Sequence, residues 1–105
     1  MTMKLHFIEA LALLLKENGL KPVREFKFLA NRKFKFDLAL PEYKIAVEFE
    51  GGIFVNGRHI RGAMYRKDCE KYNLALLDGW KVLRYATGHF PADAREQVID
   101  LVANT

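Results

Sequence analysis

The chain has 105 residues, half of them hydrophobic, so it can bury one modest core, and a single domain over residues 1–105 is expected. Its 17 Lys and Arg residues outnumber 13 Asp and Glu residues, and the formal charge of +4 suits a polyanionic partner such as nucleic acid. The one cysteine, Cys69, excludes an internal disulfide and agrees with a cytoplasmic location. The apolar run at residues 11–15 is too short to span a membrane, so no membrane partner is expected.

Seven segments with helix or strand character follow along the chain. Residues 3–18 are rich in Leu and Ala and stop at Gly19, which predicts a helix. The later segments are expected as strands at 24–28, 33–40 and 45–50, a loop at 51–62, a helix at 64–77, a strand at 80–85 and a last helix that begins near Pro91. The order α-β-β-β-α-β-α predicts an α/β (α+β) fold with a mixed central sheet flanked by helices.

The strands at 33–40 and 45–50 can be paired through a hairpin loop at residues 41–44. The apolar positions then face one another as Leu40 with Ile45, Leu38 with Val47, and Phe36 with Phe49. On the opposite face, the same register places Asp37 across from Glu48. It also places Lys35 across from Glu50. A slip of one residue would swap the two faces, so the hydrophobic match favours this register.

Three carboxylates are therefore expected on one small patch of the sheet. Directly opposed residues have Cβ atoms about 5 Å apart, which brings Asp37 close to Glu48, with Glu50 two residues further along. Like charges so close together need a compensating cation, and oxygen ligands favour Mg²⁺ or Mn²⁺ over Zn²⁺. Such an ion can hold a phosphate and activate water. The alternative is a solvent-exposed face on which Lys35 and Glu50 form an ordinary salt bridge.

The pattern of Asp37, a turn and then Glu48-Phe49-Glu50 resembles the PD-(D/E)XK nuclease superfamily. The segments 32–37, 46–52, 57–62, 68–73 and 79–84 also resemble short phage and prophage endonuclease-like proteins, which look related to the very-short-patch-repair endonucleases. The resemblance implies a Mg²⁺-dependent endodeoxyribonuclease that hydrolyses phosphodiester bonds, in the cytoplasm of a bacterium or a phage-infected host. It places Asp37, Glu48 and Glu50 at the metal site.

Two positions depart from the pattern of that superfamily. Phe36 precedes Asp37 where the superfamily loosely prefers proline, and Glu50 occupies the position that usually holds a lysine. Lys35 and Lys71 are the two candidates for the role of that lysine.

Residues outside the acidic motif are expected to support it. Glu9 lies on an apolar stripe of the first helix and is interpreted either as a further metal ligand or as an acid at the edge of the buried face. His59 is a candidate general base or phosphate ligand, although a lone loop histidine is more often neither. The expected DNA contacts are Arg58, His59, Arg61, Lys71 and Arg84. The residues expected in the core of the second helix are Tyr65, Tyr72 and Leu76.

Three functions remain open from the sequence. The leading one is a metal-dependent DNA endonuclease. A Holliday-junction resolvase of the same fold is the alternative within the enzymes, and it would act as a homodimer. A DNA-binding module that has lost catalysis is the alternative outside the enzymes, because Glu50 stands in the lysine position.

Overall fold

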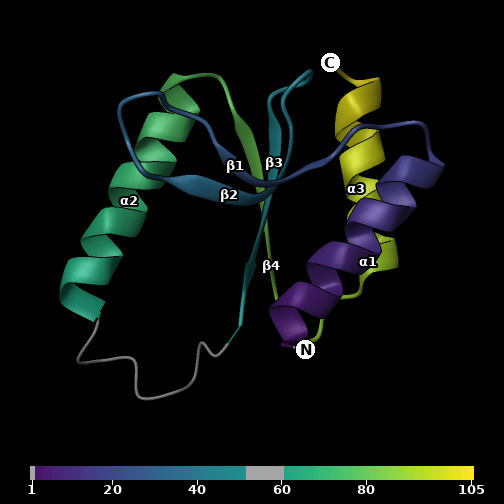
Figure 1. Cartoon of the computed structure of the whole chain (residues 1–105), viewed down its shortest axis with the longest axis horizontal. Coiled ribbons are helices and arrows are strands. Elements are labelled where there is room, and N and C mark those ends of the chain that lie inside the picture. Colours follow the sequence, from purple (N-terminus) through teal and green to yellow (C-terminus); the bar gives the residue numbers. More distant parts are fainter. Residues whose placement is uncertain (1, 52–60) are drawn as a thin grey trace.

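The computed structural model describes residues 2–51 and 61–105, which form an α+β fold in the order α-β-β-β-α-β-α (Figure 1). The helices of the described residues are α1 (Met3–Glu17), α2 (Arg61–Leu77) and α3 (Pro91–Ala103). Their strands are β1 (Val23–Lys27), β2 (Lys35–Leu40), β3 (Ile45–Glu50) and β4 (Lys81–Ala86). The fold class and element order are confirmed. The largest shift in a boundary is at α2, which begins at Arg61 rather than at residue 64.

The strands form one mixed sheet in the order β1-β2-β3-β4. The pairs β1–β2 and β2–β3 are antiparallel, whereas β4 runs parallel to β3, which requires the long crossover connection that contains α2. Figure 1 shows α2 on one side of the sheet and α1 with α3 on the other. The sheet is therefore the middle layer of three.

Local chemistry explains where α1 begins and ends. The hydroxyl of Thr2 accepts a hydrogen bond from the backbone N–H of Leu5 at 3.1 Å, which caps the first turn. At the other end, Gly19 has a φ of +78°, a left-handed conformation that glycine adopts without a steric penalty.

Among the described residues, no helix combines the length and the apolar character needed to cross a membrane.

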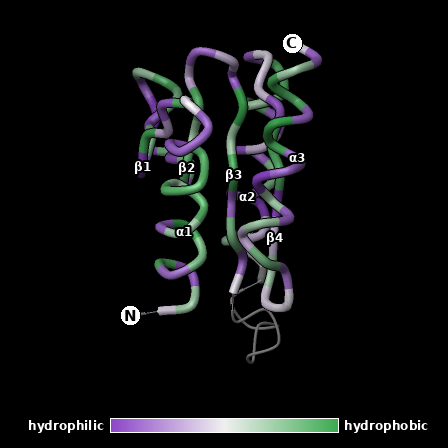
Figure 2. Tube along the Cα trace, turned by 90° about the vertical axis from the view of Figure 1, so that its right-hand side faces the viewer, coloured by the Kyte–Doolittle hydropathy of each residue, from purple (hydrophilic) through white to green (hydrophobic). Residues whose placement is uncertain are grey.

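Two hydrophobic clusters lie on opposite faces of the sheet. The larger one packs α1 and α3 against the sheet, and Figure 2 views the molecule from this side, with hydrophobic stretches in α1 and in the strands. Its fully buried members include Ile8, Leu11, Leu15, Leu38 and Val98. The smaller cluster lies toward α2 and consists of Phe28, Phe36, Ala39, Ala46, Ala75 and Trp80.

The predicted hairpin register is correct at its closed end and wrong at its open end. Leu40 pairs with Ile45 and Leu38 with Val47, as expected. Phe36 and Phe49, which were expected to share a face, lie in different clusters. Phe36 stacks on Phe28 at 4.2 Å between ring centroids, whereas Phe49 packs on Phe7 at 4.8 Å. The two strands part beyond Leu38, and Phe36 lies on the opposite face from Leu38 and Leu40 of the same strand.

Much of α2 extends into solvent. Residues 62–70 are all exposed, and the helix meets the sheet only in its C-terminal half, where Ala75 is fully buried. Two residues expected in the core are exposed instead, Tyr65 at 63% and Leu76 at 72%. Their helical spacing was compatible with an apolar face, but neither residue belongs to the hydrophobic clusters that pack on the sheet.

Candidate functional site

Asp37 of β2 and Glu48 of β3 link the two strands where the backbone hydrogen bonds between these strands end. The backbone N–H of Asp37 donates to Oε2 of Glu48 at 2.8 Å. In return, the backbone N–H of Phe49 donates to Oδ2 of Asp37, also at 2.8 Å. Both acids are buried, with 7% and 6% of their surface exposed. The carboxylates therefore supply the acceptors that the parted strands lack, since buried N–H groups must be paired.

The remaining oxygens of these two acids are held by groups from the two helical layers. Lys4 of α1 places its Nζ 2.7 Å from Oδ1 of Asp37. From the opposite side, Lys71 of α2 forms an ion pair with Oε1 of Glu48. The hydroxyl of Tyr72 donates to the same oxygen at 2.9 Å. Where β2 and β3 part, the acids of the sheet therefore meet donors from both helical layers.

Glu50 forms the outer part of the site. Its carboxylate pairs with the guanidinium of Arg84 on β4. That guanidinium lies over the ring of Tyr72, 4.4 Å from the ring centroid. Because Tyr72 also contacts Glu48, the outer pair is joined to the buried one through a single aromatic side chain.

The electrostatics of the site favour the protonated states of Lys4 and Tyr72. Partial burial works against the ammonium of Lys4, but the hydrogen bond and charge of Asp37, together with the charges of Glu48 and Glu25, outweigh it and raise its pKa. Burial raises the pKa of the Tyr72 phenol, and the charge of Glu48 and its hydrogen bond raise it further. Tyr72 therefore stays protonated and remains a hydrogen-bond donor to Glu48.

The donor set fits a hard divalent cation with few protein ligands. Within residues 2–51 and 61–105, no three His, Cys, Asp or Glu side chains are arranged to hold a metal ion. Mg²⁺ does not need three, because it is usually bound by one or two carboxylates together with water and substrate phosphate. The side chain of Lys4 is 50% exposed and can move away from Oδ1 of Asp37, whereas that of Lys71 is 13% exposed and is held in place. Asp37 and Glu48 are thus the residues that would hold such an ion.

The structure separates the two lysine candidates. Lys71 contacts Glu48 directly. Lys35 pairs across the sheet with Lys27 of β1, and the β2–β3 ladder ends before it can lie opposite Glu50. The predicted pairing of Lys35 with Glu50 is therefore wrong, because Glu50 pairs with Arg84 instead.

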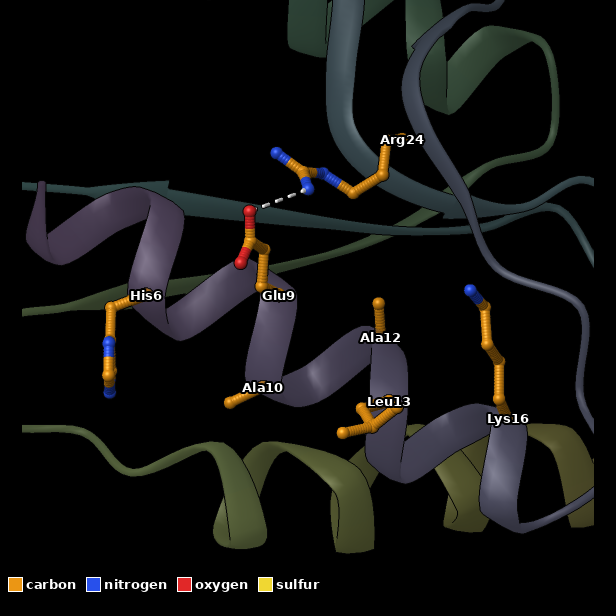
Figure 3. A pocket seen from close by; sticks show the side chains of 7 residues that line it. All are labelled: His6, Glu9, Ala10, Ala12, Leu13, Lys16 and Arg24. Atoms are coloured by element: carbon orange, nitrogen blue, oxygen red, sulfur yellow. Dashed lines mark ion pairs between the residues drawn. The ribbon is translucent and has the colours of Figure 1, made fainter. Parts of the chain in front are cut away.

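Glu9 takes part in a different contact from the one expected of a metal ligand. Its carboxylate forms an ion pair with Arg24 of β1 at 3.8 Å, beside an open pocket on the surface of α1 (Figure 3). The side chain of Glu9 is half exposed. In the described part of the chain, α1 reaches the carboxylates through Lys4, five residues earlier.

Three of the predicted DNA contacts cannot be placed. Arg58 and His59 lie outside the described residues. Arg61 is the first residue of α2, but its side chain also lies outside what the structure describes. Of the other predicted contacts, Lys71 and Arg84 both lie at the carboxylates.

The sequence did not indicate two residues of the site. Lys4 lies in the first turn of α1, far from Asp37 along the chain, and no local pattern marks it. Tyr72 was expected in the core because of its helical spacing, but its hydroxyl reaches a buried acid. Its position next to Lys71 was the one available signal.

Comparisons with protein-family models, with curated proteins and with solved structures found no match for this chain. Its function must therefore be argued from the chemistry of the site.

Proposed function

We propose that the protein is a metal-dependent DNA endonuclease of the PD-(D/E)XK type, with its active site at Asp37 and Glu48. The observation that carries the proposal is the pair of buried carboxylates at the opening between β2 and β3, with Lys71 in contact with one of them. Burying two acids side by side is costly, and such arrangements are concentrated at functional sites.

Mg²⁺ or Mn²⁺ is the proposed cofactor, held by Asp37 and Glu48, with Glu50 at the outer edge. When bound, such an ion supplies positive charge to phosphate oxygens and activates a water for attack on phosphorus. Lys4 occupies Oδ1 of Asp37 and would have to move to admit the ion. Its half-exposed side chain makes that movement inexpensive.

The chain's own residues have distinct proposed roles around these acids. Lys71 takes the place of the lysine that Glu50 replaces, because its ammonium is held at Glu48 by a nearly buried side chain, whereas the side chain of Lys4 is half exposed. Tyr72 orients Glu48 through its hydroxyl. Arg84, 48% exposed and stacked on Tyr72, is placed to contact a phosphate if its pair with Glu50 opens. DNA in a reducing cytoplasm is the proposed partner, in agreement with the positive net charge.

The decisive experiment is a nuclease assay on supercoiled plasmid, linear duplex, single strands and a four-way junction. Each substrate is tested with Mg²⁺, with Mn²⁺ and with EDTA. We expect cutting that requires the metal and is lost in Asp37→Asn. Asp100→Asn is the matched control, since it removes the same charge from an exposed position of α3. Cutting that persists in Asp37→Asn, or in EDTA, would refute the proposed site.

A DNA-binding module without catalysis is the second candidate, and one observation favours it. Each carboxylate of the site already has a cation: Lys4 for Asp37, Lys71 for Glu48 and Arg84 for Glu50. Such a site is charge-balanced without a metal ion. DNA binding without cutting on any substrate or metal would select this candidate. Calorimetric titration with Mn²⁺ separates the two further, because only the nuclease is expected to bind the ion with an affinity that depends on Asp37.

A further inference from the structure

A second charged region lies between the β1–β2 connection and α2. It is a shallow depression of about 320 Å³. The residues that line it are Asn31, Arg32, Lys33, Phe34, Lys67 and Glu70. Three of these carry positive charge and one carries negative charge, so the depression suits an anion.

One cation of the depression is fixed and two are available. Arg32 pairs with Glu70 and lies over the ring of Phe34, 4.7 Å from its centroid, which fixes the guanidinium in place. Lys33 and Lys67 are exposed, and neither has an ion-pair partner among the residues that the structure describes. The two ammonium groups are therefore available to an anion, beside a guanidinium that already has its partners.

Both walls of the depression lead directly to the proposed active site. Lys67 precedes Lys71 by one helical turn, so the two lysines share a face of α2 about 6 Å apart along its axis. On the other wall, the chain runs from Lys33 into β2 and reaches Asp37 four residues later. An extended polyanion bound at the carboxylates would thus continue over this depression.

We propose that Lys33 and Lys67, supported by Arg32, form a subsite for a backbone phosphate of duplex DNA that flanks the phosphate at the carboxylates. The choice of DNA as ligand rests on the proposed function. Contacts of this kind position a duplex without reading its sequence, because they involve only phosphate. The subsite would hold the duplex along the exposed half of α2.

The test is the binding of a short fluorescein-labelled DNA duplex in EDTA, followed by anisotropy over a series of salt concentrations. Metal is absent, so binding is measured apart from cutting. For Lys33→Gln/Lys67→Gln, we expect weaker binding and a shallower dependence of log affinity on log salt, by about 0.9 for each lost phosphate contact. The matched control is Lys21→Gln/Lys81→Gln, which removes the same charge from exposed lysines that do not line the depression. It should leave the slope close to that of the wild type.

Two further variants test the subsite, one by making the depression more positive and one by keeping its charge. Glu70→Gln removes the acid from the depression and releases Arg32, so we expect tighter binding and a steeper salt dependence. Lys33→Arg/Lys67→Arg keeps the charge and should restore the slope, because guanidinium also binds phosphate.

The outcomes separate the subsite from the proposed function. If the glutamine pair binds like the wild type, or no more weakly than the control pair, the subsite is wrong even where the protein cuts DNA. If the glutamine pair loses affinity and slope but no metal supports cutting, the subsite stands and the catalytic proposal fails. A wild type that does not bind duplex DNA in EDTA overturns the subsite, and the cutting assay with metal then decides the catalytic proposal by itself.

Discussion

At the scale of single residues, Glu48 is a charged side chain in a buried position that depends on three donors. They are the backbone N–H of Asp37, the ammonium of Lys71 and the hydroxyl of Tyr72. The attraction between buried charges often only offsets their desolvation, but removing one partner leaves the other charge unpaired. The dependence of Glu48 on Lys71 is therefore measurable as a coupling energy.

We expect Lys71→Met to lower the free energy of unfolding by on the order of 3 kcal/mol, because it leaves Glu48 buried without its cation. Glu48→Gln removes the charge, so adding it to Lys71→Met should recover much of the loss. Urea unfolding of the wild type, both single variants and the double variant gives the coupling energy. Effects that simply add would show that Lys71 does not stabilise the Glu48 carboxylate.

Tyr85 gives a prediction about alkaline pH. Burial raises the pKa of its phenol to about 12, and its hydroxyl donates to Gln97 of α3 at 2.7 Å. In the unfolded chain a tyrosine loses its proton near pH 10, at about its ordinary pKa. Between these two values the unfolded state binds fewer protons than the folded state, so the stability must fall as pH rises.

The measurement is the free energy of unfolding against pH for the wild type and Tyr85→Phe. Phenylalanine does not titrate, so the variant should lose less stability than the wild type between about pH 10 and 12. The lost hydrogen bond to Gln97 lowers its stability by a similar amount at every lower pH. Parallel curves through the alkaline range would contradict the assignment.

At the scale of elements, the opening between β2 and β3 places two carboxylates where a regular sheet would place backbone bonds. The ladder is intact at Leu38 and Val47, and beyond it the strands are joined through the side chains of Asp37 and Glu48. At the same opening, Phe36 and Phe49 lie on opposite faces of the sheet. The site and the irregularity of the sheet therefore have one structural origin.

We expect the amide of Phe49 to be protected from hydrogen exchange in the wild type, because it donates to the buried Asp37 carboxylate. Asp37→Ala should remove this protection selectively, since alanine leaves the N–H without an acceptor. Exchange of individual amides followed by NMR makes the comparison. The amide of Trp80, which donates to the Ala75 carbonyl at 2.9 Å, is the internal reference. Unchanged exchange at Phe49, or equal acceleration at Trp80, would contradict the side-chain link.

At the scale of the whole molecule, both hydrophobic clusters are built on the same strands. Leu38 and Leu40 of β2 face α1, whereas Ala39 of the same strand faces α2. A strand cannot lose one face and keep the other in register, so the two clusters should unfold together. Trp80 is the one tryptophan of the chain and lies in the smaller cluster, so its fluorescence reports that cluster alone.

We expect Leu11→Ala, on the far side of the sheet from Trp80, to shift the unfolding transition seen by Trp80 fluorescence. Leu11 is fully buried, so its truncation should cost about 2–5 kcal/mol. Leu13→Ala is the control on the same helix, because Leu13 is exposed, and its effect should stay within about 0.5 kcal/mol. If the unfolding transition followed by Trp80 fluorescence is the same in Leu11→Ala as in the wild type, the two layers unfold independently.

Much of this architecture could be predicted from local patterns. Helix stops such as Gly19 and the alternation along residues 45–50 depend on neighbouring residues only, and these elements appear where expected. The acids Asp37 and Glu48 were also correctly expected to meet, because the apolar match at Leu38 with Val47 determines the register. The predictions of burial fail where burial depends on distant parts of the chain. Tyr65 and Leu76 are examples, because both were expected in the core and both are exposed.

The sequence by itself determined the element order, the closed end of the hairpin and the meeting of the two acids, because these follow from periodicity and turn chemistry over short distances. Only the tertiary structure decided which cations reach the acids. Lys4, Lys71 and Arg84 come from three different elements, whereas Lys35, which looked equally suitable along the chain, lies beyond the end of the β2–β3 ladder. The physical reason is that ionic contacts depend on where packed layers place side-chain ends, and that placement is a property of the whole fold.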